Sequence, residues 1–168
     1  MRWVVSNLRL LCRAGGAAAA VLAAGCVSSD LSKDADTAGE VAECLPTDTP
    51  PPTVIARAIW YPHASGFGSA DEHESGVIAV AGHKLWFLEW NGQGKHFDVE
   101  HVIDVRQAAS LGVVRFGTSA MLVVQSGNLA FDSYELMKGG DVATDPQATQ
   151  ALCDQLGALR DQGPGRGP

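Results

Sequence analysis

The chain has 168 residues, which suits one domain of ordinary size together with targeting and linker segments. Its formal net charge is -7, and the Lys and Arg residues of its body are scattered singly along the sequence. Because binding to phosphates requires clustered basic residues, this composition argues against a nucleic-acid partner and against adsorption to anionic membrane surfaces.

The first 25 residues have the three regions of an export signal. Three arginines lie in the first 13 residues, an apolar run follows from 14 to 24, and small residues lead to Cys26. This is the layout of a signal peptide, and the apolar run of about ten residues is half the length of a membrane span. The alternative is a buried Ala-rich helix, which the Gly-Gly pair at 15–16 would weaken.

Residues 22–26 read Leu-Ala-Ala-Gly-Cys, which resembles the lipobox of bacterial lipoproteins. The resemblance implies that the Cys26 thiol takes a diacylglycerol thioether and that cleavage leaves Cys26 as the first residue of the mature chain. Small Ala24 and Gly25 suit a peptidase cleft, and the thiol is the best nearby nucleophile for lipid transfer. Ala23 stands where the lipobox more commonly has leucine.

The residue after the lipidated cysteine bears on the destination. In enterobacterial lipoproteins an aspartate there favours retention in the inner membrane, and this chain has Val27 instead. The resemblance therefore implies an outer-membrane protein that faces the periplasm. Two or three acyl chains give durable anchoring, so we expect the membrane, through Cys26, as one partner.

Residues 26–52 are predicted to be a flexible tether. They are rich in Ser, Asp, Thr and Pro, contain few aliphatic residues and end in three prolines at 50–52, a composition that does not build a core. The Gly- and Pro-rich end at 163–168 is predicted to be a disordered tail. The folded domain is therefore expected over residues 53–162.

Seven short runs inside this domain are rich in β-branched and aromatic residues and predict strands. They cover residues 53–61, 77–81, 84–90, 96–100, 110–116, 119–125 and 129–134. Gly and Asn lie at 82–83, 91–94, 117–118 and 126–128, where hairpin turns need positive φ, so neighbouring strands are expected to pair antiparallel. In residues 84–90 one face is wholly apolar and the other mostly so.

One helix is predicted after the strands. Asp145 is the expected N-cap and Pro146 the first helical residue, and the helix ends before Gly163. An apolar stripe runs along it and predicts that it caps one end or face of the sheet. The stripe consists of Ala148, Leu152, Leu156 and Leu159.

Seven strands followed by a helix is the element order of the pleckstrin-homology (PH) superfold, and residues 76–90 resemble the first full hairpin of bacterial PH-like and GRAM-like domains. The resemblance implies a mainly β fold, a seven-stranded antiparallel barrel or sandwich capped by the C-terminal helix. The alternative is a generic small β-barrel or sandwich with a helix.

Two cysteines remain in the mature chain besides Cys26. An oxidising compartment favours a disulfide between Cys44 and Cys153, and the alternative is two separate thiols, with Cys153 as a small core residue.

The sequence offers little for catalysis or metal binding. His96, Asp98 and Glu100 alternate on a predicted strand, and residues 71–74 combine one His with three carboxylates, but both patterns are also typical of solvated segments and match no zinc signature. There is no Gly-x-Ser-x-Gly, His-Glu-x-x-His or Gly-rich phosphate motif. We therefore expect no enzyme activity, no metal and no cofactor.

The sequence thus favours a non-enzymatic envelope lipoprotein whose PH-like domain binds an unidentified envelope protein or peptide. An exposed edge strand or the loop that contains Phe67 would make the contact, although a lone loop aromatic often packs back onto its own domain. The alternative is a carrier of a small ligand or lipid, which requires an apolar cavity of several hundred Å³. Phosphoinositides are not expected, because residues 62–76 contain three carboxylates and no Lys or Arg.

Overall fold

The computed structural model describes residues 35–62, 73–127, 131–138 and 143–162. In this part of the chain the predicted seven strands and C-terminal helix are confirmed, while the helix α2, a 3-10 turn and a two-residue strand were not predicted. The elements are α2 (Ala35–Cys44), β1 (Val54–Tyr61), β2 (Glu74–Ala81), β3 (Lys84–Asn91), β4 (His96–Asp104), η1 (Val105–Gln107), β5 (Ser110–Phe116), β6 (Ser119–Gln125), β7 (Phe131–Lys138), β8 (Ala143–Thr144) and α3 (Pro146–Asp161).

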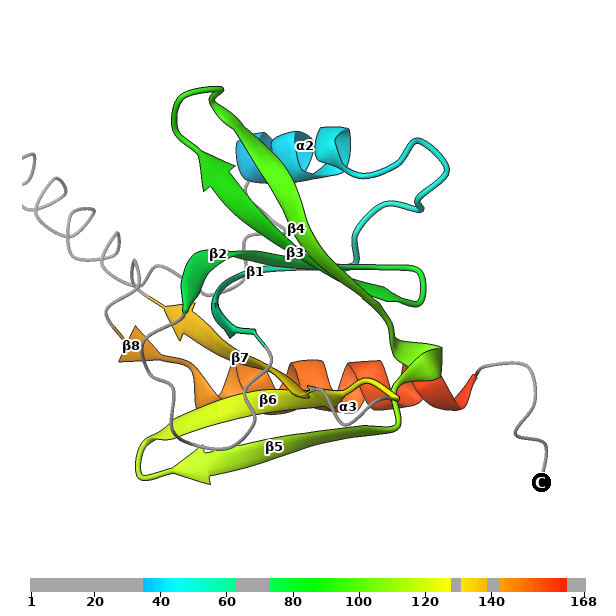
Figure 1. Ribbon diagram of the computed structural model, residues 1–168, viewed down its shortest axis with the longest axis vertical. Coiled ribbons are helices and arrows are strands. Elements are labelled where there is room, and N and C mark those ends of the chain that lie inside the picture. Colours follow the sequence, from blue (N-terminus) through cyan, green and yellow to red (C-terminus); the bar gives the residue numbers. More distant parts are fainter. Residues whose placement is uncertain (1–34, 63–72, 128–130, 139–142, 163–168) are drawn as a thin grey trace, which may run out of the picture.

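Strands β1 to β7 form one antiparallel sheet in the order β4-β3-β2-β1-β7-β6-β5, and β8 pairs with β7. Consecutive strands pair as hairpins, as expected, except that β4 and β5 lie at opposite ends of the order. Strand β1 pairs with both β2 and β7 and so joins the two halves of the sheet. Figure 1 shows these halves one above the other, with α3 alongside β5–β7 and α2 near the β3–β4 hairpin.

The hairpin turns follow the residues that permit positive φ. Gly82 (φ 60°) turns β2 into β3, and Gly117 (φ 56°) turns β5 into β6. Between β3 and β4 the positive φ falls on Lys95 (54°) instead of a glycine. There the Asn91 side-chain oxygen accepts hydrogen bonds from the backbone N–H groups of Gln93 and Gly94, which closes the turn.

Helix α3 begins as its sequence predicts. The Asp145 side chain accepts a hydrogen bond from the backbone N–H of Ala148 (3.0 Å), and the Thr149 hydroxyl donates to the Asp145 carbonyl (2.9 Å). Leu152 and Leu156 are buried against the sheet. The helix therefore closes one face of the core, as the apolar stripe indicated.

Replacing Asp145 with alanine is expected to lower the free energy of unfolding by about 1 kcal/mol, because the N-cap acceptor is lost. Asp154→Ala is the matched control, since Asp154 is exposed on α3 and accepts a hydrogen bond from the Gln150 side chain and not from a helix N-terminus. Urea denaturation of both variants measures the difference, and equal losses would contradict the capping role of Asp145.

The core has two clusters because β1, β2 and β3 are apolar on both faces. The inner cluster lies between the sheet and α3 and includes Ile78 and Phe87, whereas the outer cluster lies between the sheet and α2 and includes Ala79 and Leu88. Alternation along each strand sends successive side chains to opposite clusters. Both faces of the β2–β3 hairpin are thus covered.

The expected flexible tether over 26–52 is corrected by helix α2. Val41 and Leu45 are buried in the outer cluster, and Ala38 packs against it. These residues are three and four positions apart, so they share one face of a helix and dock it on the sheet. The polar composition of the segment concealed this short stripe. Residues 26–34 and the predicted tail at 163–168 lie outside the described residues.

Candidate functional site

Two of the predicted site residues, Cys26 and Phe67, lie outside the described residues. Lipidation of Cys26 and a contact through Phe67 therefore stay predictions. In the described part of the chain, no helix is both long enough and apolar enough to cross a bilayer.

The predicted disulfide is wrong, because Cys44 and Cys153 are both free thiols. Cys44 ends α2 and packs against the outer cluster, while Cys153 on α3 packs against the inner cluster. The sheet separates these clusters, so the two thiols are held on opposite sides of it. Burial, and after it the charge of Asp154, raises the pKa of the Cys153 thiol, which lowers its reactivity.

Strand β4 contains a β-bulge that decides which of its side chains face outward. Val99 pairs with Leu88 and His101 pairs with Phe87, which leaves Glu100 as an extra residue. The bulge shifts the alternation by one position, so Val99 and Val102 share a face although they are three residues apart. That face is the outer one, to which Leu88 belongs.

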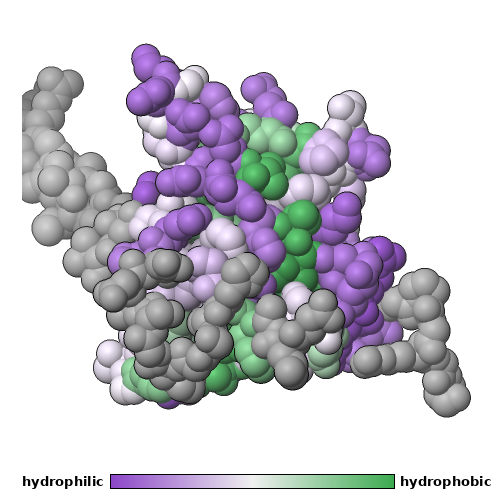
Figure 2. Space-filling view, viewed as in Figure 1, coloured by the Kyte–Doolittle hydropathy of each residue, from purple (hydrophilic) through white to green (hydrophobic). Residues whose placement is uncertain are grey.

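Four residues on this face form what we call the edge surface: Trp90, Phe97, Val99 and Val102. Trp90, Val99 and Val102 are 45%, 38% and 44% exposed, and the Trp90 ring meets the buried Phe97 ring edge to face at 5.0 Å. Helix α2 packs against β4 on this same face, but Trp90, Val99 and Val102 remain exposed. Figure 2 shows hydrophobic surface over the course of β4, with hydrophilic surface on both sides.

Three carboxylates, which we call the acidic triad, lie toward the other face of the β2–β4 strands: Glu74, Glu89 and Glu100. Burial, followed by the charges of Glu89 and Glu100, raises the pKa of Glu74. The Glu74 Oε2 atom is buried and has no hydrogen-bond partner among the residues that the structure describes. The three carboxylates of the triad therefore repel one another, and one of them, Glu100, lies on β4 itself.

The predicted His96-Asp98-Glu100 alternation holds only up to Asp98, because Glu100 is the bulge residue. His96 Nε2 lies 2.9 Å from Asp98 Oδ1, and the Asn91 amide donates to Asp98 Oδ2 at 2.8 Å. Within the described ranges, no three His, Cys, Asp or Glu side chains are arranged to hold a metal ion.

A polar cluster at the inner face was not predicted from the sequence. The Trp60 indole N–H donates to Asp132 Oδ1 (3.2 Å), and the His101 ring stacks on Trp60 at 4.8 Å. His101 Nε2 lies 3.3 Å from Asp132 Oδ2, within ion-pair distance but without hydrogen-bond direction. Asp132 is 2% exposed, so these contacts compensate the burial of a carboxyl group and join β1, β4 and β7. Their role is structural.

Both tyrosines of the chain are expected to resist ionisation in the native state. Burial, and then the charge of Asp132, raises the pKa of Tyr134 well above 10.0, while burial and Glu135 raise the pKa of Tyr61. The folded state therefore favours the neutral phenols. Their contribution to the stability of the fold is complete below the pKa of tyrosine in the unfolded chain, near 10, and is lost as pH rises through the higher pKa values of the two tyrosines in the folded protein. Phenolate absorbance should appear at higher pH in native than in urea-unfolded protein, and coincident curves would contradict the burial effect.

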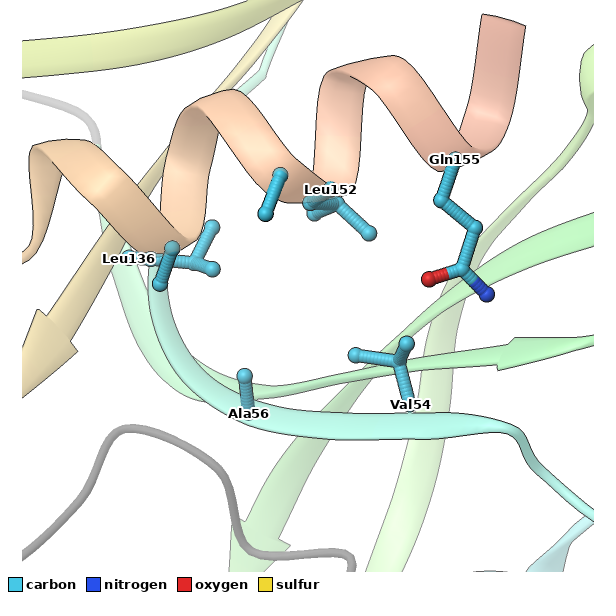
Figure 3. Close-up of a pocket in the computed structure, with 7 residues that line it drawn as sticks. Val54, Ala56, Leu136, Leu152 and Gln155 are labelled. Atoms are coloured by element: carbon cyan, nitrogen blue, oxygen red, sulfur yellow. The ribbon is translucent and has the colours of Figure 1, made fainter. Parts of the chain in front are cut away.

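A small cavity lies between α3 and β1 (Figure 3). Its volume is about 150 Å³, which is below the range of about 300 to 1,000 Å³ for typical ligand pockets. Gln155 borders it and donates a hydrogen bond from its amide to Thr53 Oγ1 at 3.1 Å. The lining residues are Val54, Ala56, Leu136, Ala148, Ala151, Leu152 and Gln155. The size of this cavity is typical of a packing defect and is too small for the binding site of a carrier protein.

No family model matches the chain, and no curated protein matches its sequence. Among solved structures, the chain is similar to two crystal structures of p115-RhoGEF: an N-terminally truncated linker-DH/PH form (TM-score 0.53) and a mutant of the DH/PH domains (TM-score 0.52). Each match is 11% identical and covers 82% of this chain, but only 37% and 38% of the two solved chains. Identity this low shows the fold alone, and by its architecture the chain has a PH-like fold.

Proposed function

We propose that the protein is a non-enzymatic lipoprotein, anchored in the outer membrane by lipid on Cys26, whose PH-like domain binds an envelope protein or peptide by strand addition to β4. The observation that carries the binding role is the edge surface on a terminal strand: among the described strands, none pairs with the outer edge of β4. The backbone N–H and C=O groups of an edge strand offer hydrogen bonds to an extended chain, and adjacent apolar side chains add burial.

The carrier alternative has less support from the packing. The inner cluster contains large side chains, and the Phe87 ring contacts both the Trp60 and the Tyr134 rings. The cavity beside α3 is small. A filled core with an exposed apolar edge is the pattern of an interaction module.

Photo-crosslinking tests the binding role in intact envelopes. A photoreactive residue at Val102 is expected to give one discrete adduct with a second protein, whereas the same residue at Phe116 is expected to give none. Val102 and Phe116 are 44% and 45% exposed and lie on the two end strands of the sheet, so they are matched in accessibility. Adducts at Phe116 alone would place the contact on β5 and contradict the proposal.

A further inference from the structure

We propose that the strand bound by β4 has apolar and basic residues in alternation, with its apolar side chains on the edge surface and its Lys or Arg side chains on the acidic triad. This inference rests on the proposed function, because it assumes strand addition at β4. It adds the chemical class of the partner, an amphipathic extended peptide of positive charge.

The two faces of β4 differ in chemistry. On the outer face, Trp90, Val99 and Val102 are exposed hydrophobic side chains. Toward the other face lie Glu89, which pairs with Asp98, and the bulge residue Glu100. Because successive side chains of an added strand point to opposite faces, those on one face would lie beside Val99 and Val102. Those on the other face would lie beside Asp98 and Glu100 of β4, with Glu89 one strand further in.

The charges favour a basic partner strand. Glu74 already experiences the charges of Glu89 and Glu100, and no described residue forms a hydrogen bond to its buried Oε2 atom. An ammonium or guanidinium group placed beside Glu100 and Glu89 would offset the like charges gathered there. Asp98, by contrast, is already held by His96 and Asn91.

Charge and a bulge are also devices that protect edge strands from aggregation. Here they act selectively. An acidic or uncharged strand gains no compensating charge at the triad, and a second copy of this chain would bring its own carboxylates, with a net charge of -7 per chain. Only a basic strand is attracted by the same carboxylates that repel an acidic strand.

The test uses the full-length Cys26→Ala protein and three synthetic peptides of equal length that alternate Val with Lys, Val with Ser, or Val with Glu. Titrations followed by the backbone amide signals of β4 locate the site and give affinities. The Val-Lys peptide is expected to bind about tenfold more tightly than the Val-Ser peptide at low salt and to lose this advantage as salt screens the charges. The Val-Glu peptide is expected to bind most weakly.

Glu100→Gln is expected to reduce the Lys-over-Ser preference about threefold, whereas Asp154→Asn, which removes the same charge from α3, leaves it unchanged. Helix α3 packs mainly against β5–β7 and η1, and Asp154 is exposed on it, which makes Asp154 a matched control. Equal binding of the three peptides at β4 overturns the inference that the partner strand is basic, but it is consistent with strand addition at β4. If none of the peptides shifts the β4 signals, strand addition itself is refuted; Val-Lys binding elsewhere on the protein overturns the inference.

Discussion

Cys26→Ala protein is expected to accumulate as an unprocessed or a soluble form without lipid, because the alanine side chain offers no sulfur for the diacylglycerol thioether. The loss of lipid anchoring is expected to be nearly complete, since the proposed anchor consists of the acyl chains on this cysteine. Mass spectrometry of the wild-type protein extracted from membranes should find Cys26 as the first residue, with lipid attached. Fractionation of the two proteins measures the effect.

Ser28→Ala is a suitable control for the anchoring experiment, because it changes a nearby small residue and keeps the cysteine. Its processing and membrane fraction are expected to match the wild type. A Cys26→Ala protein that is still cleaved and bound to membranes would refute lipid anchoring at this residue, without affecting the binding role of β4.

Val41→Asp is expected to destabilise the folded domain by about 3 kcal/mol or more, because it places a carboxylate without a partner in the outer cluster. Val41 is fully buried between α2 and the sheet. Ala42→Asp introduces the same side chain at the next position, which is exposed, and is expected to change stability by less than about 0.5 kcal/mol.

Urea denaturation, followed by tryptophan fluorescence, compares the two aspartate variants. Trp86 lies in the outer cluster with Val41, so its emission reports on the docking of α2. A flexible tether predicts the same small effect at both positions. Equal stability of the Val41→Asp and Ala42→Asp proteins would therefore contradict a docked helix.

The parts of the fold that local signals specify could be predicted from the sequence. Strands β5 and β6 have the predicted bounds, because alternating residues and the Gly117 turn delimit them. Helix α3 begins at Pro146 after its Asp145 cap. Strand β4 was predicted to end at Glu100 but extends to Asp104, since the bulge breaks the alternation that defines a strand in sequence.

The features that the sequence analysis missed or predicted wrongly depend on contacts between residues far apart in the sequence. The disulfide was inferred from the compartment, and the positions of Cys44 and Cys153 on opposite faces could not be read from composition. The Trp60–Asp132 hydrogen bond joins residues 72 positions apart, so no local pattern announces it. Exposure on β4 was suggested only in general terms, because the placement of Val99 and Val102 on one face depends on the bulge.

Together with the proposed lipid on Cys26, the docked position of α2 would limit how far the folded domain can lie from the membrane. Helix α2 starts at Ala35, so with the lipid on Cys26 only the nine peptide steps between these residues connect the anchor to the folded body. Even a fully extended chain spans at most about 3.5 Å per residue, which places the start of α2 within about 30 Å of the acyl chains. Under the proposed anchoring, a partner of β4 would therefore meet it close to the lipid surface, and proteins embedded in the same leaflet would encounter it at far higher local concentration than proteins diffusing freely through the compartment.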